Sequence, residues 1–322
     1  MTNSWKPGAS IENLKIRARV LQSIRAFFAA RNVLEVETPI LSLSAITDPQ
    51  LESFVTQLHQ KDFYLHTSPE FYMKRLLASG SGDIYQVARV FRVDEQGRNH
   101  NPEFSMLEWY RLGYDHHDLM DEMENLIMEL FGHDQSGKLN FKRISYQQAF
   151  QEELKIDPLE ATAALLKQCA QDNDVEIPQG MDLEDKDMWL DWLMVARIAP
   201  GFSKDSFTFL YDYPASQAAL ARLSQTDSRV AHRFELFYGE LELANGFYEL
   251  TDTQEQAERF EKENQQRLLR NQKAMPVDNH FLKALESGLP ECSGVAIGLD
   301  RLLMVMTGAS KISDVISFET GN

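Results

Sequence analysis

The sequence Gly294-Val295-Ala296-Ile297-Gly298-Leu299-Asp300-Arg301 is the most informative segment of this chain for its fold. Small and β-branched residues over 294–298 predict a strand, and Asp300–Thr307 predicts the beginning of a helix. Gly298 has no side chain, so a ligand can approach the backbone closely at the end of this strand. One such strand says little by itself, and its meaning depends on the segments that precede it.

Two earlier segments complete a pattern. Residues Ile11–Arg31 predict an amphipathic helix, and the strand-like residues after it end at Pro39. Residues 84–92 predict a strand that ends in Phe91-Arg92, and a polar loop leads from it to a further apolar run at 104–110. The first helix has one apolar face, formed by Val20, Leu21, Ile24, Phe27 and Phe28.

The rest of the chain predicts a single domain. Two more helices and two more strands are expected at 116–131, 253–273, 234–242 and 246–250. Between them, about 138–233, the pattern weakens into helices and loops with one strand-like stretch at 207–211. We therefore expect one α/β (α+β) domain over 1–322, built on an antiparallel sheet of six or seven strands flanked by helices, with a variable insert at about 138–233.

In this order and at these separations, the three segments resemble motifs 1, 2 and 3 of class II aminoacyl-tRNA synthetases. The resemblance narrows to lysyl-tRNA synthetase through three sequences: HNPEFSMLEWY at 100–110, ELANGFYELTD at 242–252 and TSPE at 67–70. It covers nearly the whole chain. It implies a class II catalytic core, with ATP as a substrate and Mg²⁺ as its cation.

The resemblance begins abruptly. Lysyl-tRNA synthetase has an N-terminal OB-fold domain that reads the anticodon, whereas only ten residues precede Ile11 here. This form resembles the elongation factor P–(R)-β-lysine ligases, a family of lysyl-tRNA synthetase paralogues. The resemblance implies that there is no anticodon-binding domain, that the substrate is lysine or β-lysine, and that the acceptor is elongation factor P instead of a tRNA.

Composition restricts the function classes. A net charge of −17 argues against extensive contacts with nucleic acid phosphates, which need lysine and arginine. The two cysteines, Cys169 and Cys292, form neither a disulfide framework nor a zinc signature, as is usual in a reducing compartment. No stretch approaches the length of a membrane span. We expect a cytoplasmic enzyme without a membrane partner.

Arg92 and Arg301 are the predicted catalytic residues, because the resemblance places its two catalytic arginines there. When a carboxylate attacks the α-phosphorus of ATP, negative charge builds on the phosphate, and fixed guanidinium groups stabilise it. By resemblance, the ATP site also includes Val93, Asp94, His100, Asn101, Glu242, Leu243 and Gly298.

Glu242 and Glu249 flank Ala244-Asn245-Gly246, and they are the predicted magnesium ligands, since carboxylate oxygens suit this hard cation. The same strand pair is expected to carry Asn245, Phe247 and Glu249 towards the amino acid.

Glu108 and Tyr110 are two residues apart in a predicted strand, so they share one face. By resemblance, Glu108 pairs with the terminal ammonium of the substrate and Tyr110 lies beside it. Ser68, Pro69 and Glu70 are expected to contact an amino group, although Glu70 alone also fits a first-turn acid that offsets a helix dipole.

Three positions depart from the synthetase pattern. Val93-Asp94 replaces an Asn-Glu pair, so the contact of the shorter Asp94 is either longer or taken over by Glu95. Asn99 stands where lysyl-tRNA synthetase has arginine, and Arg98 precedes it. Ala296 replaces a glycine, and its methyl group in the pocket floor is expected to change which lysine isomer fits.

The sequence favours an ATP-dependent, AMP-forming ligase that activates (R)-β-lysine and transfers it to a lysine of elongation factor P. Two alternatives remain open: a truncated lysyl-tRNA synthetase-like enzyme that charges a tRNA, and a non-catalytic paralogue that only binds an amino acid. We also expect a homodimer through the apolar face of Ile11–Arg31 and the strand end at Pro39.

Overall fold

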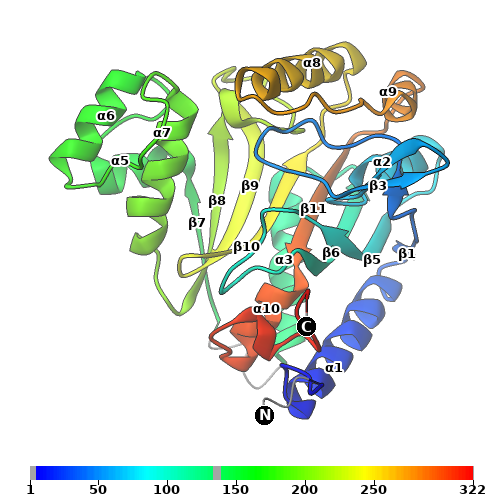
Figure 1. Ribbon diagram of the computed structural model, residues 1–322. Coiled ribbons are helices and arrows are strands. Elements are labelled where there is room, and N and C mark those ends of the chain that lie inside the picture. Colours follow the sequence, from blue (N-terminus) through cyan, green and yellow to red (C-terminus); the bar gives the residue numbers. More distant parts are fainter. Residues whose placement is uncertain (1–4, 133–138, 322) are drawn as a thin grey trace. The chain divides into compact units, whose positions relative to one another are not determined.

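The computed structural model describes residues 5–132 and 139–321 (Figure 1). Its contacts divide the chain into two compact units. The described residues of the first unit are 5–114, 129–131 and 251–321, and those of the second are 115–128, 132 and 139–250. Whether the two units are one domain with an insert, as the sequence predicts, stays a prediction.

The first unit has four main strands in the order β1-β5-β6-β11. They are β1 (Leu34–Glu35), β5 (Ile84–Phe91), β6 (Glu103–Leu112) and β11 (Cys292–Gly298). β1 runs parallel to β5, whereas β5 with β6 and β6 with β11 are antiparallel pairs. A smaller sheet in the order β2-β4-β3 consists of β2 (Leu41–Ser42), β4 (Lys61–Leu65) and β3 (Val55–Leu58). Motifs 2 and 3 therefore lie on neighbouring strands.

The first helix of this unit is α1 (Ile11–Ala29). Ser10 caps its N-terminus, because the Ser10 side chain accepts a hydrogen bond from the Asn13 backbone N–H. The others are α2 (Glu70–Ala78), α8 (Thr253–Leu269), α9 (Asn279–Glu286), α10 (Leu299–Thr307) and the short 3₁₀ helix η4 (Ile312–Asp314). In Figure 1, α8 and α9 are neighbours in gold and orange. α2 contacts α9, and Phe71 of α2 stacks on Phe281 of α9 with ring centroids 4.8 Å apart.

The apolar face of α1 packs inside the first unit. Phe28 stacks on Tyr85 of β5 with ring centroids 4.4 Å apart, and it also contacts Trp109 of β6 at 5.5 Å. Val20, Ile24 and Phe27 are buried as well. Because these side chains form the core of the chain itself, they do not present the two-fold interface that we expected from them. The homodimer stays a prediction, and it needs another surface.

The second unit has four strands in the order β10-β9-β8-β7. They are β10 (Leu241–Tyr248), β9 (Val230–Tyr238), β8 (Ser206–Pro214) and β7 (Asn140–Ser145). Only the β7–β8 pair is parallel within this set. The expected antiparallel α/β arrangement is confirmed apart from this pair and β1–β5, whereas β7, inside the region expected to hold helices and loops, was missed.

The helices of this unit include α3 (His116–Phe131), α5 (Tyr146–Leu154), α6 (Ala163–Asp172) and α7 (Lys186–Leu193), with a π turn at Met194–Ile198 and 3₁₀ turns at Ala199–Gly201 and Ala215–Gln217. α5, α6 and α7 form one core with β7, β8 and β9, in which Trp189 and Phe150 are fully buried. Among the described residues, no helix is both long enough and apolar enough to span a membrane.

Candidate active site

Arg92 and Arg301 meet at one carboxylate, that of Glu95. The Nη1 atom of Arg92 lies 3.4 Å from Oε1 of Glu95, and Nη2 of Arg301 lies 3.8 Å from Oε2. The Nε2 atom of His100 is 3.1 Å from the same Oε2. All four side chains are partly exposed. Residues from motifs 2 and 3 thus form a cationic cluster around an acid, as a site for an anion requires.

Backbone pairing fixes the position of Arg92. β5 and β6 stay in register to the Phe91–Glu103 pair, and the Arg92 N–H then donates to the Pro102 carbonyl at 3.0 Å. The guanidinium group also lies over the ring of Phe104, 5.2 Å from its centroid. The loop between the strands is therefore closed at its base, directly beside the arginine.

Arg301 is held through its neighbour Asp300. The buried Asp300 carboxylate accepts hydrogen bonds from Nη1 of Arg17 at 2.5 Å and from the Ser105 N–H at 2.7 Å. Arg17 belongs to α1 and Ser105 to β6, so this carboxylate ties the beginning of α10 to both elements. Gly298, opposite Met106 in the β6–β11 pair, ends the strand just before this helix. The sequence did not identify Arg17 and Asp300 as supports of the site.

The remaining residues of the motif 2 loop divide into two groups. Val93 and Asp94 are exposed, and Glu95 rather than Asp94 makes the contacts with the arginines. The Asn101 amide binds the C-terminal segment, donating to Oγ1 of Thr320 and accepting from its N–H, both at 3.0 Å. Arg98 points elsewhere as well, because its Nε donates to the Ser310 carbonyl at 2.6 Å. Roles of Val93, Asp94 and Asn101 in binding ATP stay predictions.

Glu108 and Tyr110 share a face of β6, as predicted. The Tyr110 hydroxyl donates to Oε1 of Glu108 at 2.8 Å, and each residue is only 2% exposed. Ala296 of β11 and Gln86 of β5 are the cross-strand partners of Glu108 on its two sides. Gln86, which accepts a hydrogen bond from the Thr38 hydroxyl at 3.0 Å, was not predicted. Three neighbouring strands therefore place the predicted isomer-determining methyl group directly beside the predicted ammonium-binding acid.

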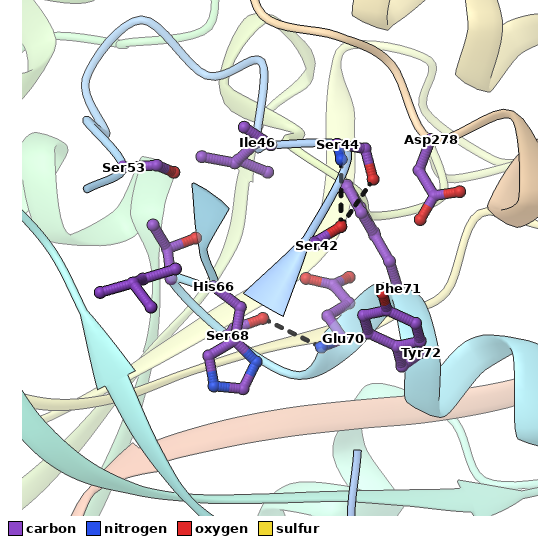
Figure 2. Close-up of a pocket in the computed structure, with 13 residues that line it drawn as sticks. Ser42, Ser44, Ile46, Ser53, His66, Ser68, Glu70, Phe71, Tyr72 and Asp278 are labelled. Atoms are coloured by element: carbon purple, nitrogen blue, oxygen red, sulfur yellow. Dashed lines mark hydrogen bonds between the residues drawn. The ribbon is translucent and has the colours of Figure 1, made fainter. Parts of the chain in front are cut away.

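A pocket of about 40 Å³ lies at the turn before α2 (Figure 2). Ser68 and Glu70 line it, and Oγ of Ser68 accepts a hydrogen bond from the Glu70 N–H at 3.1 Å. Pro69 precedes α2 and is not part of the lining. Oε1 of Glu70 also pairs with the buried Nζ of Lys74 at 2.6 Å, so part of its charge is balanced internally. The other lining residues are Ser42, Ser44, Ala45, Ile46, Ser53, Leu65, His66, Thr67, Phe71, Tyr72 and Asp278.

In the second unit, β10 carries the other predicted residues. A register shift between Glu242 and Ala244 leaves Leu243 as an extra, buried residue. Asn245 lies opposite Glu235 of β9 and accepts a hydrogen bond from Nε of Arg233 at 3.2 Å. Phe247 packs on a small cluster of alanines. Arg233 and Glu235, paired at 2.5 Å, were not predicted.

Carboxylates of this strand pair have the chemistry of a magnesium site. Burial raises the pKa of Glu235, Arg233 opposes this, and the negative charge of Glu242 raises the pKa further. Glu242 is exposed, and Glu249 is buried beyond the end of β10. Acids whose charges repel one another are stabilised by a divalent cation, and their hard oxygen atoms are the ligands that Mg²⁺ prefers. The oxygen atoms of Glu242 and Glu249 have the chemistry that Mg²⁺ prefers, and their coordination of the ion stays a prediction.

His116, Asp212 and His232 form another group of titratable side chains in the second unit. Oδ1 of Asp212 is 3.2 Å from Nε2 of His116 and 3.6 Å from Nδ1 of His232. Asp212 has a φ of 60° at a bulge in β8, which turns its carboxylate towards both rings. Burial raises the pKa of Asp212, but the hydrogen bonds from the two histidines outweigh this and hold it well below its ordinary value. Imidazole–carboxylate pairing accounts for the arrangement.

Comparison with known proteins agrees with the motifs. A family model for class II tRNA synthetases (D, K and N) matches residues 6–321. Proteins named elongation factor P–(R)-β-lysine ligase from Salmonella arizonae and Yersinia enterocolitica are each 48% identical to this chain, covering 98% and 99% of it and 98% of their own length. One of the same name from Vibrio atlanticus is 46% identical over 99% of the chain and 98% of its own length. The chain belongs to the family of class II tRNA synthetases (D, K and N).

Proposed function

We propose that the chain is an ATP-dependent ligase that activates (R)-β-lysine as an aminoacyl-adenylate and transfers it to a lysine side chain of elongation factor P. The observation that carries the proposal is the meeting of Arg92 and Arg301 at Glu95, because two guanidinium groups fixed on one anion are what adenylate formation needs. The shared name of the full-length relatives supports the choice of substrate and acceptor.

In the first step, an oxygen of the amino acid carboxylate attacks the α-phosphorus of ATP, and pyrophosphate leaves. Negative charge increases on the α-phosphate as the new bond forms. Arg92 and Arg301 stabilise this charge, and His100 adds a donor on the same side of the loop. Glu95 holds the three side chains in place until the phosphates arrive. A non-catalytic paralogue has no need of this pair of cations.

Recognition of the amino acid uses the buried acid of β6. Glu108 accepts the terminal ammonium group, and Tyr110 keeps one of its oxygens oriented. The substrate has a second amino group besides its terminal ammonium. Ala296 narrows the space beside Glu108, and the reduced space favours one position of this second amino group over another. Ser68 and Glu70 line the pocket that receives this second amino group.

In the second step, a neutral lysine amine of the acceptor attacks the adenylate carbonyl. AMP leaves with the bonding electron pair, the amine loses a proton, and an amide forms. The net charge of −17 favours a protein acceptor over a tRNA backbone. Because the acceptor is a translation factor, we place the enzyme in the cytoplasm.

The cation of the reaction is Mg²⁺, with Glu242 and Glu249 as its ligands. When bound, it neutralises charge on the ATP phosphates. Asn245 and Phe247 of the same strand are oriented by Arg233 and by the alanine cluster, respectively.

The test measures ATP–pyrophosphate exchange with a panel of amino acids that includes both enantiomers of β-lysine, α-lysine, ornithine and arginine. We expect (R)-β-lysine to give the highest kcat/KM. The enzyme is then incubated with ATP and labelled β-lysine, separately with elongation factor P and with tRNA. A base-stable label on a lysine of the factor is expected. A base-labile label on tRNA alone would replace this proposal by a tRNA-charging enzyme.

A further inference from the structure

One wall of the pocket is a segment without helix or strand. Residues 45–53, between β2 and β3, contribute Ala45, Ile46 and Ser53 to the lining. A segment without helix or strand has no regular backbone hydrogen bonds within itself, so its conformation depends on hydrogen bonds from other elements. This segment is called the pocket segment below.

Arg267 of α8 makes three of these bonds. Its side chain is completely buried. Nη1 donates to the carbonyl groups of Asp48 and Leu51 at 3.0 and 3.1 Å, and Nη2 donates to the Glu52 carboxylate at 2.5 Å. Nε donates to the Lys273 carbonyl at 2.8 Å, which fixes the chain just after α8. One guanidinium group therefore joins three residues of the pocket segment, Asp48, Leu51 and Glu52, to α8.

Further hydrogen bonds also connect the pocket segment to α8 and to the residues after it. The buried Thr47 hydroxyl donates a short hydrogen bond to Oε2 of Glu263, one helical turn before Arg267. Nε2 of Gln272 donates to the Pro49 carbonyl at 3.0 Å, and the Ala45 N–H donates to the Pro276 carbonyl at 3.1 Å. The segment is thus bonded at successive residues to α8 and to the chain that follows it.

The same segment reaches the motif 2 loop. The Glu52 carbonyl accepts a hydrogen bond from the Val93 N–H at 3.0 Å, directly after Arg92. The wall of the amino acid pocket and the residue that follows the first catalytic arginine are therefore parts of one hydrogen-bonded network. All of these residues belong to the first unit.

We propose that Thr47, Glu263 and Arg267 are positioning residues, through which α8 holds the pocket segment as a fixed wall and thereby sets the affinity for the amino acid. None of the three lines the pocket. A wall that is already ordered spares the ligand the entropy cost of ordering it on binding, and this lowers KM without changing the chemical step. This inference rests on the proposed function for its kinetic part only.

The experiment uses the full chain and compares four substitutions on this network with one control. Thr47→Val removes the hydroxyl at nearly constant shape, and Glu263→Ala removes its acceptor, whereas Glu263→Gln keeps an acceptor oxygen. Arg267→Lys keeps the charge but loses the fork of donors. Glu258→Ala is the matched control, because Glu258 is an exposed acid of the same helix that accepts a hydrogen bond from the Gln254 side chain.

Two readouts are measured. In pyrophosphate exchange, Thr47→Val and Glu263→Ala should raise KM for the amino acid about three- to tenfold, and Arg267→Lys about ten- to a hundredfold, with kcat changed less than about threefold. Glu263→Gln should restore KM to near the parent value, and Glu258→Ala should not change it. In hydrogen–deuterium exchange without ligand, the amides of residues 45–53 should exchange faster in Thr47→Val and Glu263→Ala than in Glu258→Ala.

Equal amide exchange in the Thr47→Val, Glu263→Ala and control proteins would overturn the proposal, whatever the enzyme acts on. A loss of kcat at unchanged KM, in variants that melt cooperatively, would also overturn it, because it would show a role in folding or chemistry. If the parent protein activates no lysine-like amino acid, the proposed function fails, and the amide exchange still decides whether α8 holds the segment.

Discussion

Among single residues, Arg301 offers the sharpest test of the catalytic cluster. Arg301→Ala removes one of the two cations that meet at Glu95. Because this cation acts on charge that develops during the reaction, adenylate formation should fall by about 100-fold or more. Pyrophosphate exchange measures the effect, and the melting temperature should change little.

Arg98→Ala is the matched control for this substitution. Arg98 belongs to the same motif 2 loop, but its guanidinium group is exposed and donates to the Ser310 carbonyl. We expect it to keep most of the exchange rate. Near-normal exchange in Arg301→Ala would remove Arg301 from the chemistry.

Glu108 tests recognition of the amino acid. Glu108→Gln keeps the shape of the side chain and the possibility of a bond from Tyr110, but it removes the charge opposite the substrate ammonium. A charge-assisted contact in a buried site is worth about 1.5–3 kcal/mol, so KM for the amino acid should rise roughly ten- to a hundredfold. KM for ATP should stay nearly the same. Unaltered KM for the amino acid would place the ammonium elsewhere.

The sequence could predict which single residues share a face where their spacing alone decides it, whereas their roles in the reaction stay predictions. The shared face of Glu108 and Tyr110 follows from a spacing of two, and their hydrogen bond agrees with it. Glu95 contacts both arginines, whereas the possibility that it takes over the ligand contact of Asp94 stays a prediction. Gln86 and Arg17 were missed for a physical reason. Gln86 lies beside Glu108 only because of the β5–β6 register, and Arg17 reaches Asp300 only through the docking of α1. Neither of these two contacts can be predicted from the residues next to Gln86 or Arg17 in the sequence.

At the scale of elements, α8 makes stability depend on pH. Burial is the main cause that raises the pKa of Glu263 to about 7, and the negative charge of Asp48 raises this pKa further. The hydrogen bond from Thr47 and the positive charges of Arg259 and Lys262 lower the pKa, but they do not outweigh burial. A carboxyl group whose pKa is higher in the folded state stabilises the fold most below its unfolded pKa. This contribution is lost as pH rises through 7.

Glu263→Gln should therefore flatten the pH dependence of stability. Between about pH 4.5 and 8 the parent protein should lose on the order of 3 kcal/mol more of its unfolding free energy than Glu263→Gln does. Urea titrations at a series of pH values measure this difference. Glu258→Gln, an exposed acid of the same helix, should follow the parent curve. Parallel curves for the parent and Glu263→Gln would show that Glu263 titrates normally.

Elements were predicted well where the periodicity is strong. The helix expected at 253–273 is α8, and β5, β6 and β11 lie where their apolar patterns placed them. β7 was missed because Asn140–Ser145 mixes polar and apolar residues, and it becomes a strand through its pairing with β8. β1 is shorter than the strand-like residues before Pro39 suggested, since only Leu34–Glu35 pairs with β5. Tertiary pairing decided these cases, not local propensity.

At the scale of the whole molecule, the assembly state has to be argued from the surface that the fold leaves exposed. The apolar face of α1 is buried in the core of the chain. In contrast, six large apolar residues between 34 and 58 are exposed: Leu34, Ile40, Leu41, Leu43, Val55 and Leu58. Such a concentration is more typical of an interface than of a free surface. It includes Ile40, which directly follows the Pro39 strand end expected to contribute to a homodimer.

We therefore predict a dimer of about twice the 37.0 kDa chain mass in sedimentation or light scattering. In the single chain, Leu43 is 59% exposed and Val55 is 52% exposed. The double substitution Leu43→Asp and Val55→Asp places two charges at the proposed interface, and it should shift the protein towards the monomer. Leu269→Asp is the control, because Leu269 on α8 is 84% exposed and lies outside this group. A parent protein that stays an active monomer at high concentration would contradict the dimer. Dissociation by the control substitution alone would move the interface to α8.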